Sequence, residues 1–361
     1  MTIRVFEAFA GYGSQSIALR NIGVNYEVVA ISEIDKYTIK AYEAIHGPVN
    51  NLGDISKIKI EDVPQHDLFT YSFPCQDISV AGKRKGIEKG KTRSGLLYEC
   101  EKIIEHCRPK YLLMENVKNL VGKKFKAQFD EWLAYLESLG YTNYYQVMNS
   151  KHYGIPQNRE RVFCVSILDE HREYSFPKPY GYCKSVSDLL EDNVGEKYYL
   201  NQSTLDKLFF NVGKNVMNMK DGLMYFKNYD SNIEKLDSIN ILKNKNSITV
   251  KLPCICASRG RYIENPSARI SGLPTVQMIE INEKDTSNTI TTVGKDNYVL
   301  ENTLRIRKLT TRETFRFMGL SDFDIDCIEN SQIPITQQYK MAGNSIVVSV
   351  LEEIFKELLL K

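Results

Sequence analysis

Short β-prone runs alternate with amphipathic helical runs through the first third of the chain. In order, these runs read IRVFEAF, SQSIALRNI, YEVVAIS, KYTIKAYEAI, DLFTYS, GLLYECEKIIEH and KYLLMEN. Strands that alternate with helices form βαβ units, in which successive strands lie parallel and helices cover the sheet. The pattern therefore predicts the α/β fold class, with a doubly wound and mostly parallel sheet.

The hydrophobic pattern changes after about Pro177. Residues 180–300 show little helical periodicity and contain short β-prone runs such as NSITVKL and SNTITTV. A helical pattern returns in TRETFRFMG, and the run SIVVSVLEEIFKELLL carries its apolar residues on one helical face. We therefore predict one doubly wound domain built from residues 1–178 and 305–361, with a smaller β-rich domain, 179–304, inserted between them.

Composition places few further limits on this picture. The chain has 361 residues, of which 42% are hydrophobic and 25% charged, as in ordinary globular proteins and unlike membrane-spanning or disordered chains. The net charge of +2 does not by itself indicate a polyanionic partner. Because the N-terminal sequence lacks a signal peptide, we expect a cytoplasmic protein whose eight cysteines stay reduced, and the cysteine spacing indicates no metal site.

Two glycines and an acidic residue outline a candidate nucleotide-type site. Gly11 and Gly13 follow the first strand directly, and Glu33 ends the second strand, where a carboxylate can accept both hydroxyls of a ribose. A dinucleotide needs a third glycine, and that position is Ser16, so S-adenosylmethionine fits the pattern better than a dinucleotide. Asp54 either contacts the adenine amino group or caps a loop, and the sequence favours neither.

Cys75 and Glu115 are candidate reactive groups at strand ends. Cys75 follows Pro74 in TYSFPCQDIS, and it is either a nucleophile with a lowered thiol pKa or a lone structural cysteine. Glu115 ends the apolar strand LLMEN. Burial there should raise its pKa unless a partner compensates, so it is either a proton-holding acid or an ion-paired structural residue.

Basic residues occur in two further patterns. Arg159 and Arg161 alternate along an extended segment and therefore share one side, where they either hold an anion or form a surface pair. The run KRKGIEKGKTR has six basic residues and one acidic residue, and it begins shortly after Cys75. Such a run is either a solvated surface segment or a loop that contacts phosphates.

Six ordered segments resemble the motif series of the DNA cytosine-5 methyltransferases. They are FAGYGSQ, SFPCQDIS, LLMENVKN, YGIPQNRERVF, RKLTTRETFRFMG and QQYKMAGNSI. The resemblance runs from near residue 5 to about residue 350 and leaves only the middle region outside it. It implies a Rossmann-like catalytic domain, an inserted target recognition domain, and methyl transfer from S-adenosylmethionine to carbon 5 of a flipped-out cytosine in a short duplex DNA sequence.

The resemblance also implies roles for the candidate reactive residues. Cys75 would add to carbon 6 of cytosine, and Glu115 would hydrogen-bond or protonate N3. Arg161 would bind the carbonyl oxygen of the base, and Arg159 would bind neighbouring backbone or the thiolate. We expect a monomeric modification enzyme of bacterial or phage type, with a cognate restriction endonuclease as its functional partner.

The expected cofactor site draws on several motifs. By resemblance its residues are Phe9, Gly11, Tyr12, Gly13, Glu33, Ile34, Asp54, Ile55, Pro74, Leu96 and Asn344. Glu33 would bind the ribose and Asp54 the adenine amino group. The family often has a tryptophan where this chain has Ile34, so adenine stacking should be weaker here or supplied by another residue.

DNA contacts are expected in two places. The basic run would form a loop that closes over the DNA backbone through Lys83, Arg84, Lys85, Lys91 and Arg93. In the middle region, Arg259, Arg261 and Arg269 would contact guanine edges or phosphates. Thr289 with Ile290 resembles the threonine-plus-aliphatic pair of the family's recognition domain, and Thr249 with Val250 is a competing pair.

Three rival functions remain to be compared with this interpretation. An RNA cytosine-5 methyltransferase would share the same motifs, but a long β-rich middle region favours duplex DNA over the stacked aromatics of single-stranded RNA readers. A noncatalytic DNA-binding protein could keep the fold, although all four candidate catalytic residues are present. A dehydrogenase is the most distant alternative, because the third glycine is missing.

Overall fold

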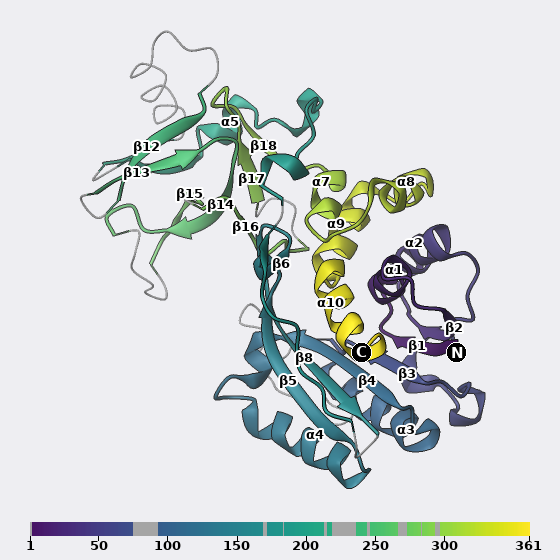
Figure 1. The fold of residues 1–361 in the computed structure, drawn as a ribbon. Helices are drawn as coiled ribbons and strands as arrows, with labels where there is room; N and C mark the ends of the chain where they lie inside the picture. The colour runs from purple at the N-terminus through teal and green to yellow at the C-terminus, as the bar shows by residue number, and fades with distance from the viewer. Residues whose placement is uncertain are drawn as a thin grey trace.

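Two six-stranded sheets form the framework of the protein (Figure 1). The computed structural model describes residues 2–74, 93–168, 172–182, 184–212, 215–218, 236–243, 246–265, 273–282, 284–292 and 297–361. The first sheet comes from the N-terminal half of the chain and the second from the middle region. In Figure 1 the helices α7 to α10 lie between the second sheet and α1.

The first sheet has the strand order β2-β1-β3-β4-β8-β5. Its strands are β1 (Ile3–Ala8), β2 (Tyr26–Ser32), β3 (Leu68–Tyr71), β4 (Tyr111–Val117), β5 (Thr142–Asn149) and β8 (Glu160–Ile167). The four strands β2, β1, β3 and β4 are parallel, and β8 runs antiparallel to both β4 and β5. This mostly parallel sheet confirms the predicted fold class.

Helices cover both faces of the first sheet. They are α1 (Ser14–Asn21), α2 (Lys36–His46), α3 (Leu97–Cys107), α4 (Lys126–Ser138) and α10 (Val348–Leu359). Side chains of a strand point alternately to opposite faces, so Val5 packs into the core that contains α1 and α10, while Phe6 packs into the core that contains α3 and α4. The last helix of the chain thus completes the layer begun by the first.

The second sheet has the strand order β11-β10-β15-β14-β17-β18. Its strands are β10 (Leu208–Val212), β11 (Asn215–Asn218), β14 (Cys254–Arg261), β15 (Val276–Ile281), β17 (Asn297–Leu300) and β18 (Ile306–Lys308). Only the pairing of β10 with β15 is parallel among these described strands. Strand β18 lies past the predicted domain boundary at residue 304, yet it pairs with β17.

Smaller elements complete the described part of the structure. Three two-stranded pairs are β12 (Ser238–Lys243) with β13 (Asn246–Lys251), β6 (Tyr153–Gly154) with β9 (Gly181–Tyr182), and β7 (Gln157–Asn158) with β16 (Ser287–Asn288). The remaining α-helices of the described ranges are α5 (Gln202–Leu205), α7 (Thr311–Arg316), α8 (Asp322–Asn330) and α9 (Ile335–Asn344). Short 3-10 helices span Ile55–Lys57, Ile60–Asp62, Arg93–Leu96, Lys118–Val121, Ser150–His152, Ser187–Leu189 and Glu196–Tyr198. Within the described ranges, no helix has the length and apolarity needed to cross a bilayer.

A buried carboxyl group lies between the first sheet and α1. Glu7 of β1 is fully buried, and Ser16 of α1 donates a hydrogen bond of 2.8 Å to its Oε1. Burial raises the pKa of Glu7 from 4.5 to about 7, because the surrounding protein cannot solvate the charged form. Glu7 is therefore protonated in mildly acidic solution.

Glu7 should make stability fall as pH rises from about 4.5 to about 7. In that window the folded chain binds a proton that the unfolded chain has released, so deprotonation costs the folded state about 3 kcal/mol by pH 8. Glu7→Gln removes this titration and should flatten the pH profile of the unfolding free energy. Urea unfolding of both proteins between pH 5 and pH 8 tests this, and parallel profiles would contradict it.

Candidate functional site

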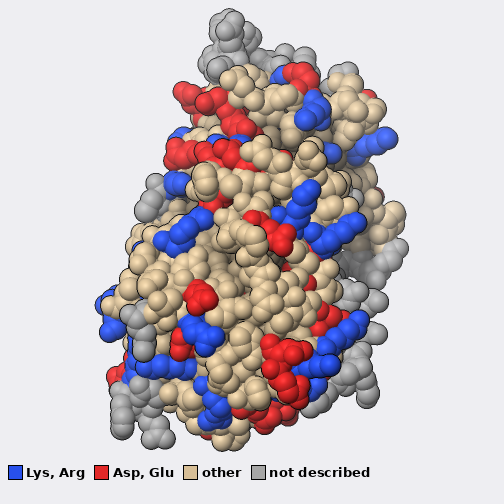
Figure 2. Space-filling model, turned by 90° about the vertical axis from the view of Figure 1, so that its right-hand side faces the viewer, with Lys and Arg blue, Asp and Glu red and all other residues tan. Residues whose placement is uncertain are grey.

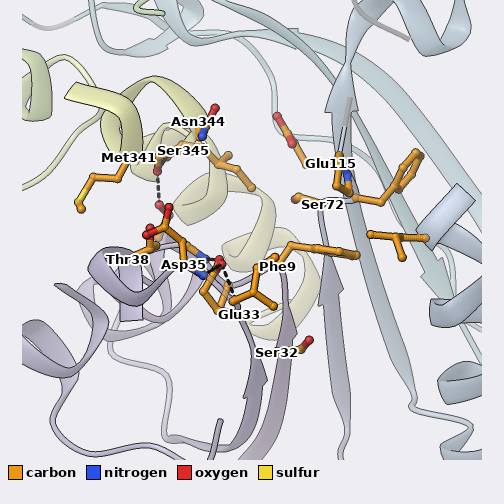
Figure 3. A pocket seen from close by; sticks show the side chains of 18 of the residues that line it. Phe9, Ser32, Glu33, Asp35, Thr38, Ser72, Glu115, Met341, Asn344 and Ser345 are labelled. Atoms are coloured by element: carbon orange, nitrogen blue, oxygen red, sulfur yellow. Dashed lines mark hydrogen bonds between the residues drawn. The ribbon is translucent and has the colours of Figure 1, made fainter. Parts of the chain in front are cut away.

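A cavity of about 610 Å³ lies at the carboxyl ends of the parallel strands. The ends of β1, β2, β3 and β4 form one side, and the C-terminal end of α9 forms another. Figure 3 shows Glu115 and Ser72 across the cavity from Asn344 and Ser345, with Phe9 and Glu33 below them. Predicted site residues that line it are Phe9, Gly11, Glu33, Ile34, Asp54, Ile55, Pro74, Leu96, Glu115, Arg159, Arg161 and Asn344.

Backbone N–H groups hold Glu33 in place at the end of β2. Gly11 donates to Oε2 at 3.1 Å, while Ile34 and Asp35 donate to Oε1 at 2.8 and 2.9 Å. Gly11 has a φ of 61°, and a Cβ atom there would meet no other atom within 4 Å, so its backbone faces open space. The side chain of Ile34 is 73% exposed beside this carboxylate.

Tyr12 and Gly13 lie behind the wall of the cavity and do not line it. The ring of Tyr12 is buried and packs edge-on against Phe315, with ring centroids 5.7 Å apart. Gly13 has a φ of 81°, and a Cβ atom there would lie 2.4 Å from Nε2 of His46. Gly13 therefore lets the first turn of α1 approach α2, which is a packing role.

Asp54 caps a turn and lines the cavity at the same time. Its Oδ1 accepts hydrogen bonds from the backbone N–H and the hydroxyl of Ser56, at 3.1 and 2.7 Å. These hydrogen bonds from Ser56 lower the pKa of Asp54, so the carboxylate is held in its charged form. The two roles left open by the sequence are compatible.

Glu115 and Arg161 form an ion pair at the opposite side of the cavity. Nε of Arg161 lies 3.1 Å from Oε1 of Glu115, and both side chains are largely buried. Burial raises the pKa of Glu115, and the nearby charges of Arg161 and Arg159 oppose that rise without cancelling it. Glu115 consequently holds a proton more readily than an exposed glutamate does.

Arg159 binds three backbone carbonyl groups from distant parts of the chain. Its Nη1 donates to the oxygen of Ile290 at 2.9 Å, and its Nη2 donates to those of Gly343 and Ser345 at 3.1 and 2.5 Å. The residue is only 3% exposed. A buried guanidinium group is stable only when such acceptors surround it. Arg159 therefore joins the start of β8 to α9 and to the segment after β16.

Sequence reasoning missed several contacts that close the site. Lys340 of α9 forms an ion pair of 2.6 Å with Asp35, and both residues line the cavity. The hydroxyl groups of Ser14 and Ser345 lie 2.7 Å apart and join the start of α1 to the end of α9 (Figure 3). These residues occupy the quoted motifs or their neighbours, but only the folded chain shows which of them meet.

Some predicted residues lie outside the described part of the chain. They are Cys75, Lys83, Arg84, Lys85, Lys91 and Arg269. For Arg93 the backbone alone is described, as the first residue of a 3-10 helix. The chain on either side of residues 75–92 meets at the cavity, because Ser94 donates a hydrogen bond of 2.7 Å to the carbonyl oxygen of Pro74.

The two described arginines of the expected base-reading set share one acidic partner. Nε of Arg259 lies 3.2 Å from Oε2 of Glu280, and Nε of Arg261 lies 2.5 Å from Oε1. On the face of the molecule in Figure 2, basic and acidic residues intermingle instead of forming a single basic patch. Arg259 and Arg261 are thus partly neutralised by Glu280.

The two competing threonine-plus-aliphatic pairs occupy different cores. Thr289 donates a hydrogen bond of 2.8 Å to the carbonyl oxygen of Asn158, and Ile290 packs into the core around α1 and α10. Val250 lies in β13 and packs into the core of the second sheet instead. Only the pair Thr289 and Ile290 therefore lies next to Arg159.

Comparison with known proteins agrees with the motif series. The model of the C-5 cytosine-specific DNA methylase family matches residues 3–360. The chain belongs to this family. The match confirms the resemblance and the expected enzyme class, DNA (cytosine-5) methyltransferase.

The similarity to known relatives covers almost the whole chain. The type II methyltransferase M2.ScrFI of Lactococcus lactis subsp. cremoris is 37% identical over 411 residues, covering 99% of each chain. The type II methyltransferase M.HaeII of Haemophilus aegyptius is 32% identical, covering 97% of this chain and 91% of its own. The crystal structure of S. pombe Dnmt2 methyltransferase has the same fold, with a TM-score of 0.65, 18% identity, and coverage of 100% of this chain and 98% of its own.

Arg159→Lys should lower the unfolding free energy by roughly 2–4 kcal/mol, because an ammonium group cannot reach three separate carbonyls from one position. Arg161→Lys is the matched control: Arg161 has an 18% exposed side chain, and its replacement should cost less than about 1.5 kcal/mol. Urea unfolding measures both. Equal losses would contradict the special role of Arg159 in joining the chain segments.

Proposed function

We propose that the protein transfers a methyl group from S-adenosylmethionine to carbon 5 of a flipped-out cytosine in a specific short duplex DNA sequence. The supporting observation is that one cavity brings the Gly11–Glu33 site together with the Glu115–Arg161 pair. In this proposal residues 1–178 and 305–361 form the catalytic domain, and residues 179–304 form the target recognition domain.

The residues of the cavity suit S-adenosylmethionine. The volume of about 610 Å³ is in the range of cofactor sites. Glu33 offers a fixed carboxylate for the ribose hydroxyls, Asp54 a charged acceptor for the adenine amino group, and the exposed Ile34 an apolar surface for the ring. When bound, the cofactor supplies an electrophilic methyl group on a sulfonium centre.

Cytosine must be activated before carbon 5 can accept a methyl group. We assign Cys75, which follows the cavity residue Pro74 in the chain, as the thiolate that bonds to carbon 6. The electron pair that enters the ring moves toward N3, where the proton of Glu115 stabilises it. Arg161 keeps Glu115 oriented and binds the carbonyl oxygen of the base. Carbon 5 then bonds to the methyl carbon as the bond from that carbon to the sulfonium sulfur breaks, with its electron pair left on sulfur. A water accepts the proton of carbon 5, and the thiolate of Cys75 leaves carbon 6, which restores the aromatic ring.

The reaction requires a base that has rotated out of the duplex, at a cost of a few kcal/mol. We assign the phosphate contacts that offset this cost to the basic run between Lys83 and Arg93. We assign base reading to Arg259 and Arg261 of the second sheet and to the segment that begins at Thr289. We further propose a monomeric cytoplasmic enzyme. The relatives named type II methyltransferases support a cognate restriction endonuclease as its functional partner, whereas the relative from Bacillus phage SPbeta is named an orphan methyltransferase.

Glu33→Gln should weaken binding of S-adenosylmethionine by roughly tenfold or more, because a fixed charged acceptor for the ribose is lost. Glu27→Gln changes an exposed glutamate of the same strand and should leave the affinity unchanged. Isothermal titration calorimetry with S-adenosylmethionine measures both variants. Equal affinities for wild type and Glu33→Gln would remove the proposed ribose contact.

Cys75→Ser should abolish methyl transfer while leaving DNA binding largely intact, since a serine hydroxyl is a far weaker nucleophile at neutral pH. The assay follows tritium from the methyl group of S-adenosylmethionine into plasmid DNA or transfer RNA, and bisulfite sequencing then locates the modified cytosine. Wild type should also form a covalent complex on duplex DNA that contains 5-fluorocytosine.

Three outcomes of that assay would overturn the proposal. A near-normal rate for Cys75→Ser would eliminate the covalent mechanism. Tritium in RNA alone would favour the RNA methyltransferase. A wild-type protein that binds DNA without trapping or methylating it would be a noncatalytic binding protein.

A further inference from the structure

Both backbone polar groups of Ile290 are bound by side chains from one short segment. The N–H of Ile290 donates to Oε1 of Gln157 at 3.0 Å, and its carbonyl accepts from Nη1 of Arg159 at 2.9 Å. We call this pair of contacts the Ile290 clamp. Ile290 is 2% exposed and Gln157 is fully buried, so water does not compete for these hydrogen bonds.

The amide of Gln157 has a second partner on another element. Its Nε2 donates to the carbonyl oxygen of Phe317 at 2.7 Å, directly after α7. The amide oxygen of Gln157 therefore accepts from the segment after β16, and its amide nitrogen donates to the residue that follows α7. Only a side chain that donates and accepts at these two positions satisfies both buried groups.

Further contacts fix the same segment along its length. Strands β7 and β16 pair in parallel, and Thr289 donates to the carbonyl of Asn158. Next along the chain, Thr291 and Thr292 lie against Gly343 of α9, where a Cβ atom would come within 2.3 Å of the Thr291 carbonyl carbon. Gly343 also accepts from Arg159 and lines the cavity. The segment 287–292 is thus held between β7 and the cavity wall.

We propose that Gln157 is a positioning residue for methyl transfer. Through the Ile290 clamp it fixes the segment 287–292, whose strand β16 packs against β14 of the second sheet, on the wall of the catalytic cavity. It thereby fixes where a flipped cytosine arrives relative to Arg161 and Glu115. This inference rests on the proposed function. Rate depends steeply on such placement, since a shift of about 1 Å can cost about a hundredfold in rate. Gln157 lies outside the cavity lining and acts through Ile290 and Arg159.

Gln157→Leu keeps the side-chain volume and removes both hydrogen bonds. At saturating DNA and S-adenosylmethionine, its single-turnover rate should fall by roughly tenfold to a hundredfold, while the affinity for S-adenosylmethionine stays within about twofold of wild type. Gln338→Leu is the matched control: Gln338 is another buried glutamine, donating to the carbonyl of Ile333 at 2.9 Å within the C-terminal part of the chain. Gln338→Leu should lower the free energy of unfolding about as much as Gln157→Leu does, but it should keep the wild-type rate of methyl transfer.

Gln157→Glu supplies a readout that loss of packing does not imitate. The protonated acid has the shape of glutamine and can donate to Phe317 and accept from Ile290, whereas the carboxylate cannot donate and faces a carbonyl oxygen. Burial raises the pKa of such an acid, so the rate of the variant relative to wild type should rise as pH falls from about 8.5 to about 6.

The two experiments separate the inference from the proposed function. If wild type fails to methylate DNA in the assay, the proposed function fails. If wild type methylates DNA but folded Gln157→Leu matches its rate, or the ratio for Gln157→Glu stays flat with pH, the positioning role is wrong. If Gln157→Leu does not fold, the pH dependence of Gln157→Glu decides alone.

Discussion

The structure depends on the buried positive charge of Arg159. A guanidinium group removed from water is costly unless its N–H groups find acceptors, and here the acceptors are carbonyls of residues 290, 343 and 345. Those residues belong to the segment after β16 and to the C-terminal end of α9. Three parts of the chain must therefore converge at the start of β8 before the charge is stable. The convergence closes the cavity and holds the segment after β16 against its wall.

Two carboxyl groups in this one cavity have their pKa values shifted in opposite directions. Burial raises the pKa of Glu115, whereas hydrogen bonds from Ser56 lower that of Asp54. Divergent values of this kind separate a group that holds a proton from one that remains a charged acceptor. In the proposed reaction, the protonated Glu115 activates the cytosine ring, and the charged Asp54 recognises the adenine amino group of the cofactor. The fold creates this divergence by burying Glu115 in β4 and by placing Asp54 at the N-terminus of the 3-10 helix Ile55–Lys57, where Ser56 donates to it.

Sequence patterns predicted the fold class and the strand ends that carry Glu33 and Glu115. They did so because parallel strands end at the same edge of a sheet, so local periodicity already indicates which residues gather there. The residues that contact the site residues from distant parts of the chain could not be predicted in this way. Nothing near Arg159 in sequence indicates that its acceptors lie 131 to 186 residues away. Gly13 was expected at the cofactor, but its neighbours His46 and Tyr42 belong to a later helix. Tertiary contacts of this kind depend on packing that no local pattern contains.

The layer formed by α1 and α10 joins the first helix of the fold to the last. Any chain on the ribosome that stops before α9 lacks Met341, Asn344 and two of the three acceptors of Arg159, and therefore has no closed cavity. Strand β1 can pair with β2 and β3 before synthesis is complete. The apolar face of the sheet that α10 covers is not buried until the last residues have been made. Unfinished translation products thus carry the strand ends that line the cavity without the wall that closes it.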